Sequence, residues 1–163
     1  MDYHNIKNWK FPEVDQTYTE NDSILYALGI GFGQEPTNPQ QLKYVYEKNM
    51  QTFPTMAVVL GYPGFWMKDP KAGVNWVKLV HGEQRLKIHK PLPTSGRVIG
   101  RGRITHVIDK GADKGALVLS ERTLQDPEGN LYVTTNSTTF CRGDGGLSQS
   151  DEAPAALQAT PDR

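Results

Sequence analysis

The segment that most restricts the fold of this chain runs from Leu79 to Arg97 and reads LVHGEQRLKIHKPLPTSGR. Apolar side chains alternate with basic ones over Arg85–His89, which is the two-residue period of a strand buried on one face. This strand has to end at Pro91 and Pro93, because proline cannot donate a hydrogen bond to a strand ladder. The glycine directly after His81 predicts either a bend at the start of the strand or a close approach of the backbone to a ligand.

The rest of the second half repeats this pattern of strands and turns. Further strands are expected over residues 97–109, 116–125 and 131–142, the last of which is rich in β-forming residues. The glycine-bounded residues 110–115 and the sequence DPEGN at 126–130 are turn signals between these strands. We therefore expect a meander of four long antiparallel strands.

The N-terminal part carries a different pattern. Residues 1–17 are expected to form an extended arm, which Tyr3, Trp9 and Phe11 can anchor on a partner surface. Thr19 and Asp22 have the spacing of a capping box, which predicts that a helix begins there. An apolar stripe over residues 24–28 predicts the buried face of this helix.

Three more segments precede residue 79. The sequence LKYVYEK at 42–48 predicts a strand from its alternating tyrosines, although Asn38-Pro39 in front of it also suits a helix cap. The run TMAVVL at 55–60 is too short for an amphipathic helix and predicts one or two turns. Residues 61–75 carry many glycines, prolines and aromatic residues, which predicts a long functional or mobile loop.

Composition limits the class of protein. A chain of 163 residues is about one domain long, and a single core can bury most of its apolar surface. Its 18 basic and 18 acidic residues balance, so no broad field favours nucleic acid or an anionic membrane. The single cysteine, Cys141, excludes an internal disulfide, and no apolar run suits a signal peptide or a membrane span. We therefore expect a soluble intracellular protein.

The residues alone indicate no catalytic centre. The four histidines occur singly, without the spacing of metal ligands, and Cys141 next to Phe140 is typical of a buried, inert thiol. Glu83, Asp109 and Glu121 are candidate acids or bases, but each is more simply a strand-end or solvated carboxylate. The basic residues of the expected strands form either a local anion site or the solvated face of a sheet. They are Arg85, Lys87, Arg97, Arg101 and Arg103.

Several short strings follow one another along the chain. They are YTE with ILYALGIG, then LKYVYE, FPTMAVVLG, LVHGEQRL, KPLPTSGRV, DKG and RGDGG, and together they span about residues 18–146. The HGEQ-like and KPLP-like strings in this order are far more specific than any single motif. The chain thus resembles the N-terminal half of the type-2 enoyl-CoA hydratases, the MaoC-like double hot-dog enzymes that include the hydratase unit of peroxisomal multifunctional enzyme type 2.

This resemblance implies an α+β hot-dog fold, in which a curved antiparallel sheet wraps around a short helix, as the N-terminal half of a double hot-dog. The shortened helix leaves space for a bulky acyl chain, and the brief TMAVVL run agrees with that. The implied organisation is an N-terminal arm (1–17), a MaoC-like hot-dog domain (18–146) and a C-terminal linker (147–163). The linker sequence has no apolar periodicity.

The resemblance also implies a reaction and the residues that bind its substrate. Members of the family hydrate a trans-2-enoyl-CoA reversibly to the (3R)-hydroxyacyl-CoA, and no metal or organic cofactor takes part. In the family, the His-Gly of the HGEQ string and the lysine of the DKG turn contact the CoA ester. This implies that His81, Gly82 and Lys110 bind the substrate here. A lysine suits a phosphate or pantetheine oxygen as a compact charge.

One part of the family pattern is absent from the sequence. The acid/base Asp and His of the family lie on a GDxNPLHxD-like string in a second hot-dog half, whereas Gly143-Asp144 is followed here by glycines. We therefore predict no catalytic residue in this chain. We expect a catalytic hot-dog half in the same polypeptide or in a separate chain, within a homo- or hetero-oligomer. The expected compartment is the cytoplasm, or the peroxisome in a eukaryote.

Two other functions stay open at this point. A non-catalytic hot-dog subunit would bind acyl-CoA, or act as a structural subunit, in a heteromeric complex. A hot-dog thioesterase needs an activating carboxylate on the central helix, and the TMAVVL run contains none. The thioesterase therefore ranks below the other two functions.

Overall fold

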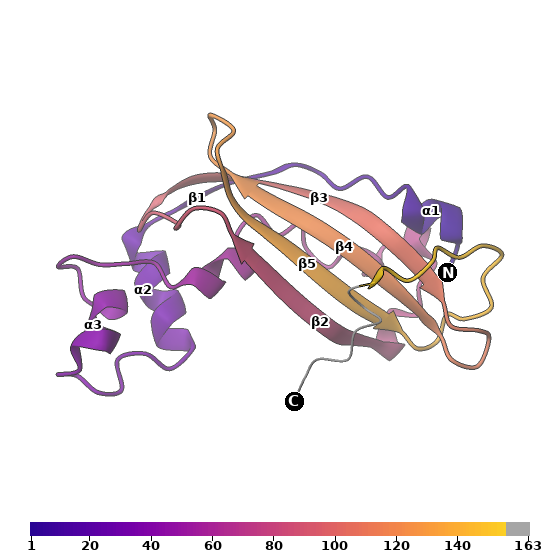
Figure 1. Cartoon of the computed structure of the whole chain (residues 1–163), viewed down its shortest axis with the longest axis horizontal. Coiled ribbons are helices and arrows are strands. Elements are labelled where there is room, and N and C mark those ends of the chain that lie inside the picture. The colour runs from indigo at the N-terminus through magenta and orange to yellow at the C-terminus, as the bar shows by residue number, and fades with distance from the viewer. Residues whose placement is uncertain (156–163) are drawn as a thin grey trace.

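One antiparallel sheet forms the body of the computed structural model, which describes residues 1–155 (Figure 1). Its five strands lie in the order β1-β3-β4-β5-β2, so β1 and β2 are the edge strands. The strands are β1 (Val14–Tyr18), β2 (Leu79–Ile88), β3 (Gly96–Asp109), β4 (Ala116–Gln125) and β5 (Leu131–Cys141). The four strands predicted after residue 79 are confirmed.

The extended arm predicted over residues 1–17 is wrong for its first part. Tyr3–Lys7 form the helix α1, and the end of the predicted arm forms β1, which pairs antiparallel with β3. Ile6 is fully buried in a cluster of apolar side chains on the sheet. The N-terminal segment therefore packs into the same core as the strands, because its apolar side chains cover sheet surface that would otherwise face water.

Helix α2 (Glu20–Gly29) begins where the capping box predicts. The Thr19 hydroxyl oxygen accepts a hydrogen bond from the Asp22 backbone N at 3.3 Å, and the Asp22 carboxylate accepts one from the Thr19 backbone N at 2.7 Å. The bonds from Thr19 also hold the pKa of the Asp22 carboxyl below its ordinary value. The two reciprocal bonds satisfy donors that lack a partner at the start of a helix.

The apolar stripe predicted as the buried face of α2 is wrong. Leu25 and Leu28 are 68% and 50% exposed, whereas Ser23 and Ala27 are buried. The Ser23 hydroxyl donates to the Thr94 carbonyl oxygen at 2.7 Å. The helix thus docks on the proline turn after β2 through small residues, since long side chains would not fit in so close a contact.

The strand predicted at 42–48 is also wrong, because the helix α3 (Pro39–Val45) occupies most of this segment. The Asn38 side chain accepts a hydrogen bond from the Gln40 backbone N at 2.9 Å, and proline occupies the first turn. The helix cap noted as the alternative therefore outweighs the β propensity of the tyrosines. Three aromatic rings pack together around α3 with centroids 4.6–5.1 Å apart: Phe32, Tyr44 and Phe53.

The 3-10 helix η1 (Pro54–Val58) forms the short run predicted at 55–60 and packs on the inner face of the sheet. The prediction of one or two turns is confirmed. Met56 and Ala57 are buried in the apolar cluster formed with β3, β4 and β5. After η1 the chain crosses the backbone of β3 so closely that a Cβ on Gly100 would lie 2.3 Å from the Gly61 carbonyl oxygen.

The loop predicted over residues 61–75 contains short helical turns. The 3-10 helices η2 (Trp66–Lys68) and η3 (Pro70–Ala72) lie within it, and η4 (Trp76–Lys78) leads into β2. Figure 1 shows α2 and α3 beyond one end of the sheet and α1 near the opposite end, next to β3. Within residues 1–155, no helix is long and apolar enough to cross a membrane.

Residues 147–155 belong to the predicted linker and contact the sheet. The Asp151 carboxylate accepts hydrogen bonds from the Tyr3 hydroxyl at 2.6 Å and from the Val107 backbone N at 2.9 Å. It also pairs with the ammonium group of Lys7. The rest of the predicted linker, residues 156–163, lies outside the described residues. The boundaries assigned to the domain and the linker stay predictions.

Candidate functional site

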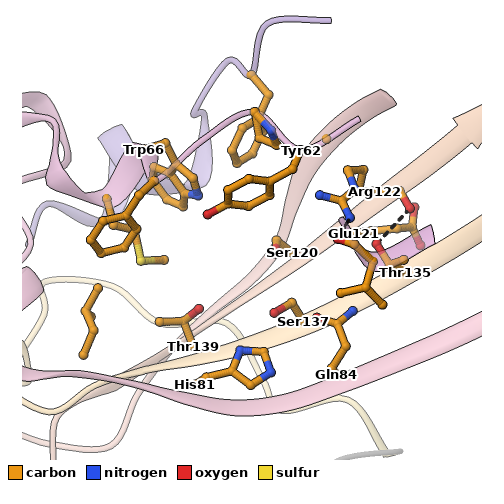
Figure 2. A pocket seen from close by; sticks show the side chains of 17 residues that line it. Tyr62, Trp66, His81, Gln84, Ser120, Glu121, Arg122, Thr135, Ser137 and Thr139 are labelled. Carbon is orange, nitrogen blue, oxygen red and sulfur yellow. Dashed lines mark hydrogen bonds between the residues drawn. The ribbon is translucent and has the colours of Figure 1, made fainter. Parts of the chain in front are cut away.

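A cavity of about 300 Å³ lies between the inner face of the sheet and the segment that follows η1 (Figure 2). One wall, which we call the roof, is aromatic and apolar and includes Phe11, Val58, Tyr62, Phe65, Trp66 and Met67. The opposite wall, which we call the floor, comes from β2, β4 and β5 and includes His81, Gln84, Ser120, Arg122, Thr135, Ser137 and Thr139. The floor is polar, although the covered face of a sheet is normally its apolar one.

The N-terminal segment fixes the roof in place. The Trp66 ring lies 4.8 Å from the Trp9 ring and 5.2 Å from the Phe11 ring, measured between centroids. Such contacts between aromatic rings add to the stabilisation from burial. The residues predicted to form an arm therefore hold one side of the cavity.

A β-bulge in β2 decides which side chains face the cavity. The pairing of β2 with β5 shifts between His81 and Glu83, so Gly82 is the extra residue. Because a bulge shifts the alternation of side chains by one, His81 and Gln84 both line the cavity. A Cβ at position 82 would lie 3.1 Å from the Thr138 carbonyl oxygen. Packing within the chain therefore favours glycine at this position.

Arg122 is a charged residue on the floor. Its Nη2 donates to the carbonyl oxygens of Val58 at 2.5 Å and Ala57 at 3.4 Å, at the end of η1. Its Nε is buried and has no hydrogen-bond partner among the described residues. The guanidinium carbon lies 5.6 Å from the centre of the Tyr62 ring, which is a cation–π distance. Burial lowers the pKa of Arg122, but a guanidinium stays protonated in proteins.

The predicted substrate-binding residues all lie toward one end of the sheet. His81 lines the cavity, whereas Gly82 and Lys110 do not. Asp109, the neighbour of Lys110, is the last residue of β3 and pairs with Ala116 of β4. Ala116 in turn pairs with Cys141 of β5, and Cys141 pairs with Leu79, the first residue of β2. Three inter-strand spacings of about 4.8 Å, or roughly 14 Å in total, separate those strands. The structure thus brings His81 and Gly82 together but not Lys110, and their contacts with CoA stay predictions.

Lys110 lies on a turn that Asp109 organises. The Asp109 carboxylate accepts hydrogen bonds from the backbone N of Gly111 at 3.0 Å, of Gly146 at 2.9 Å and of Leu147 at 3.0 Å. These bonds, that from Gly111 foremost, lower the pKa of the Asp109 carboxyl. The carboxylate therefore has a structural role, and the Lys110 side chain is exposed on a well-defined turn.

The other candidate reactive groups have structural roles too. Cys141 is fully buried, and burial raises the pKa of its thiol to about 12, so it is not a nucleophile near neutral pH. The Glu121 carboxylate accepts a hydrogen bond from Arg103 at 2.9 Å. Among the described residues, no hydrogen bond or ion pair joins His81 to a carboxylate. No group of three or more His, Cys, Asp or Glu side chains within residues 1–155 is arranged to hold a metal ion.

Arg122 was not among the residues predicted from the sequence. The arginines predicted as a possible anion site are paired with carboxylates, as in the ion pairs Arg97–Asp15, Arg101–Glu13 and Arg103–Glu121. These arginines therefore form a solvated face and no anion site. A signal for Arg122 was nevertheless present, because this residue alternates in phase with apolar or small residues of the same strand. They are Ala116, Val118, Ser120 and Leu124.

Most of the chain matches one known protein family. Residues 16–143 match the family described as MFE-2 hydratase 2 N-terminal domain. The chain is 32% identical to the enoyl-CoA hydratase ChsH3 of Mycobacterium tuberculosis, over 94% of this chain and 54% of that protein. It is 35% identical to the peroxisomal enoyl-CoA hydratase 2 of Arabidopsis thaliana, over 88% of this chain and 48% of that protein. The chain thus spans about half the length of these relatives.

A solved structure shows the same arrangement of strands. The MaoC-like dehydratase from Phytophthora capsici superposes with a TM-score of 0.74 at 26% identity. The match covers 100% of this chain and 57% of that one. The predicted hot-dog fold, with a curved antiparallel sheet around a short helix, is therefore confirmed.

Proposed function

Since the chain belongs to the family of MFE-2 hydratase 2 N-terminal domains, we propose that it is the substrate-binding half of a (3R)-specific 2-enoyl-CoA hydratase. In the reverse direction the same enzyme is a 3-hydroxyacyl-CoA dehydratase. The observation that carries this proposal is the cavity of about 300 Å³ next to the shortened helix η1. Apolar rings on one side and an open strand surface on the other suit a bulky or long acyl chain.

The proposed reaction adds water across the C2=C3 double bond of a trans-2-enoyl thioester. A hydroxyl group is added to C3 and a proton to C2. In this proposal His81 and Gly82 lie beside the thioester, and Lys110 pairs with a phosphate or pantetheine oxygen of CoA. The general acid and base come from the second half, because the carboxylates next to the cavity are already paired, as Glu121 is with Arg103.

A second hot-dog half completes the enzyme in this proposal. Strand β2 is an edge strand, and apolar side chains at its start are exposed. Trp76 is 42%, Val77 75% and Val80 43% exposed. An unpaired strand edge beside exposed apolar side chains favours association with another chain or domain. We propose that the catalytic half covers this edge, either within one polypeptide or as a separate subunit.

The proposed reaction needs no cofactor, and the second hot-dog half is its proposed macromolecular partner. Hydration moves a proton and a hydroxyl group without a net change of electrons, so a redox group has no role in it. Neither nucleic acid nor a membrane takes part. The proposed compartment is the cytoplasm, or the peroxisome in a eukaryote, as the name of the Arabidopsis relative states for that protein.

The test measures hydration of a trans-2-enoyl-CoA by the chain alone and after addition of a catalytic hot-dog half taken from a relative. We expect the chain alone to bind the thioester without turnover. With the catalytic half, the (3R)-hydroxyacyl product should accumulate, and chiral analysis of the product would identify it. Robust hydration by the chain alone would refute the proposed division between the two halves.

A non-catalytic acyl-CoA-binding or structural subunit is the second candidate. It is favoured by the cavity itself, in which the described residues form no acid/base pair around His81. Kinetics of the complex distinguish the two functions. The substitutions His81→Ala and Lys110→Ala should change KM or kcat if the cavity serves turnover, and unchanged values for both would favour the structural subunit.

A further inference from the structure

The floor of the cavity is more polar than an unsubstituted hydrocarbon chain requires. Hydroxyl groups of Ser120, Ser137 and Thr139 line it opposite Tyr62 and Trp66 (Figure 2). No group within residues 1–155 hydrogen-bonds these three hydroxyls. Methylene groups cannot take the place of the water that such hydroxyls bind, and a buried polar group without a partner is unfavourable. The floor therefore suits a ligand that carries polar atoms.

Arg122 adds a positive charge to the same floor. One guanidinium nitrogen donates to the Val58 carbonyl oxygen at 2.5 Å, while Nε is buried without a partner. No carboxylate among the described residues forms an ion pair with this guanidinium. A partly desolvated cation is stabilised most by an anion or a strong oxygen acceptor within hydrogen-bond distance. Within residues 1–155 the protein supplies only backbone carbonyls, so this charge is left for an acceptor on a ligand in the cavity to pair.

The residues around Arg122 cannot neutralise it. Glu121 is next in sequence and borders the cavity, but its side chain lies on the opposite face of the sheet, where its carboxylate pairs with Arg103 at 2.8 Å. Arg101 on the same opposite face pairs with Glu13 at 2.7 Å. Arg101 and Arg103, outside the cavity, thus have carboxylate partners, and Arg122 inside it has none among the described residues.

Arg122 lies far from the residues predicted to contact the thioester. It pairs with Thr135 on β5, whereas His81 pairs with Thr139 on the same strand. Four residues of a strand span about 14 Å. An acyl chain with its thioester beside His81 would therefore run under the aromatic roof and end near Arg122.

We infer that Arg122 is a specificity-determining residue, and that the cavity selects acyl chains whose distal end carries an oxygen acceptor, a carboxylate above all. The inference rests on the proposed function, because it assumes that an acyl chain occupies the cavity. The distal oxygen would accept hydrogen bonds from the guanidinium, and the hydroxyls of the floor would solvate polar groups on the way.

Titration calorimetry of the full chain with CoA thioesters of one length tests this inference. The three ligands are dodecanoyl-CoA, 12-hydroxydodecanoyl-CoA and the CoA monothioester of dodecanedioic acid, which end in a methyl, a hydroxyl and a carboxylate group. The octanoyl and decanoyl series identify the length that fits best. We expect the carboxylate end to bind at least about ten-fold more tightly than the methyl end, as a charged hydrogen bond allows. The hydroxyl end should lie between them.

Substitutions then assign the preference to one side chain. In Arg122→Met the ratio of the two affinities should fall to about one, because a thioether has no hydrogen to donate and carries no charge. The same change at Arg97, which pairs with Asp15 and does not line the cavity, is the matched control and should leave the ratio unaltered. If Arg122→Met does not fold, Arg122→Gln keeps a donor for Val58 but removes the charge, and it should lose most of the preference.

The outcomes separate this inference from the proposed function. Equal affinities for the three ends, or a preference that persists in Arg122→Met and Arg122→Gln, would overturn the inference. In that case binding of the methyl-ended thioester would leave the proposed function intact. Failure of all three thioesters to bind would overturn both.

Discussion

Replacement of Gly100 by alanine tests how the segment after η1 is held on the sheet. A Cβ at this position would lie 2.3 Å from the carbonyl oxygen of Gly61, 2.8 Å from its Cα and 2.9 Å from its carbonyl carbon. All three are backbone atoms, so no side-chain rotation can relieve the contact. The Gly61 carbonyl has to retreat until the contact reaches 3.4 Å, where ordinary van der Waals contact begins.

The free-energy cost follows from what this retreat disturbs. Overpacking of a close contact costs about 1–3 kcal/mol. The Gly61 backbone N also donates to the Gln16 side chain at 2.8 Å, and loss of such a bond costs about 1 kcal/mol. We therefore expect Gly100→Ala to lower the free energy of unfolding by about 3 kcal/mol. For a domain of this size, that corresponds to a decrease in Tm of roughly 6–12 °C.

Urea and thermal denaturation measure this change, and Gly29→Ala is the matched control. Gly29 is the last residue of α2, and a Cβ there would meet no atom within 4 Å. The control should be as stable as the parent or slightly more stable, because alanine restricts the unfolded chain. Gly100→Ala should also weaken binding of an acyl-CoA, since Tyr62 on the roof moves with Gly61. A Tm within about 1 °C of the parent would refute the close contact between Gly61, after η1, and Gly100 of β3 as a determinant of stability.

Three other perturbations follow from Lys110, Asp109 and the edge of β2. Lys110→Ala should weaken acyl-CoA binding by about 1–3 kcal/mol. Calorimetry should show a smaller loss of binding free energy at high salt, and also for a pantetheine thioester that lacks the nucleotide phosphates. Equal losses under all these conditions would mean that the turn had only lost its shape. The pKa of Asp109 is lowered in the folded chain. The stabilisation of the folded chain by this carboxylate is therefore complete above the pKa of the unfolded chain, near 4, and disappears as the pH falls through the pKa of the folded chain. Asp109→Asn should therefore be less stable than the parent at neutral pH and converge with it in acid, and parallel urea curves at all pH values would contradict this. The chain alone should dimerise or aggregate at roughly tens of micromolar, and light scattering from a stable monomer would exclude that.

The second half of the fold was predictable because its signals are local. Strands β3, β4 and β5 follow one another as hairpins, and each turn is specified by residues next to it. At the second turn, the Asp126 side chain accepts a hydrogen bond from the Asn130 backbone N at 2.7 Å. A strand period together with such a turn determines both the pairing and its direction. The resemblance to the family added the wrapping of a curved sheet around a shortened helix, which the strand period alone does not determine.

The first half was less predictable because distant contacts determine it. Ser23 is buried since it donates to Thr94, which lies 71 residues further along the chain. Ile6 is buried by packing on β3 and the loop before β2. Hydrophobic patterns within α2 or the N-terminal segment contain no information on these partners. The strand predicted at 42–48 failed for a local reason, since a proline-containing helix cap competed with β propensity and was stronger.

The charge of the cavity depends on register in a way that composition cannot reveal. Glu121 and Arg122 are neighbours on β4, and a strand places neighbouring side chains on opposite faces. In the observed register Glu121 pairs with Arg103, and Arg122 lies opposite Gly102, which lines the cavity. A shift of one residue would exchange the two faces and place a carboxylate in the cavity instead of a guanidinium. That shift would also expose Leu124, which is fully buried in the observed register. The apolar core of β4 therefore determines which sign of charge an acyl chain in the cavity meets.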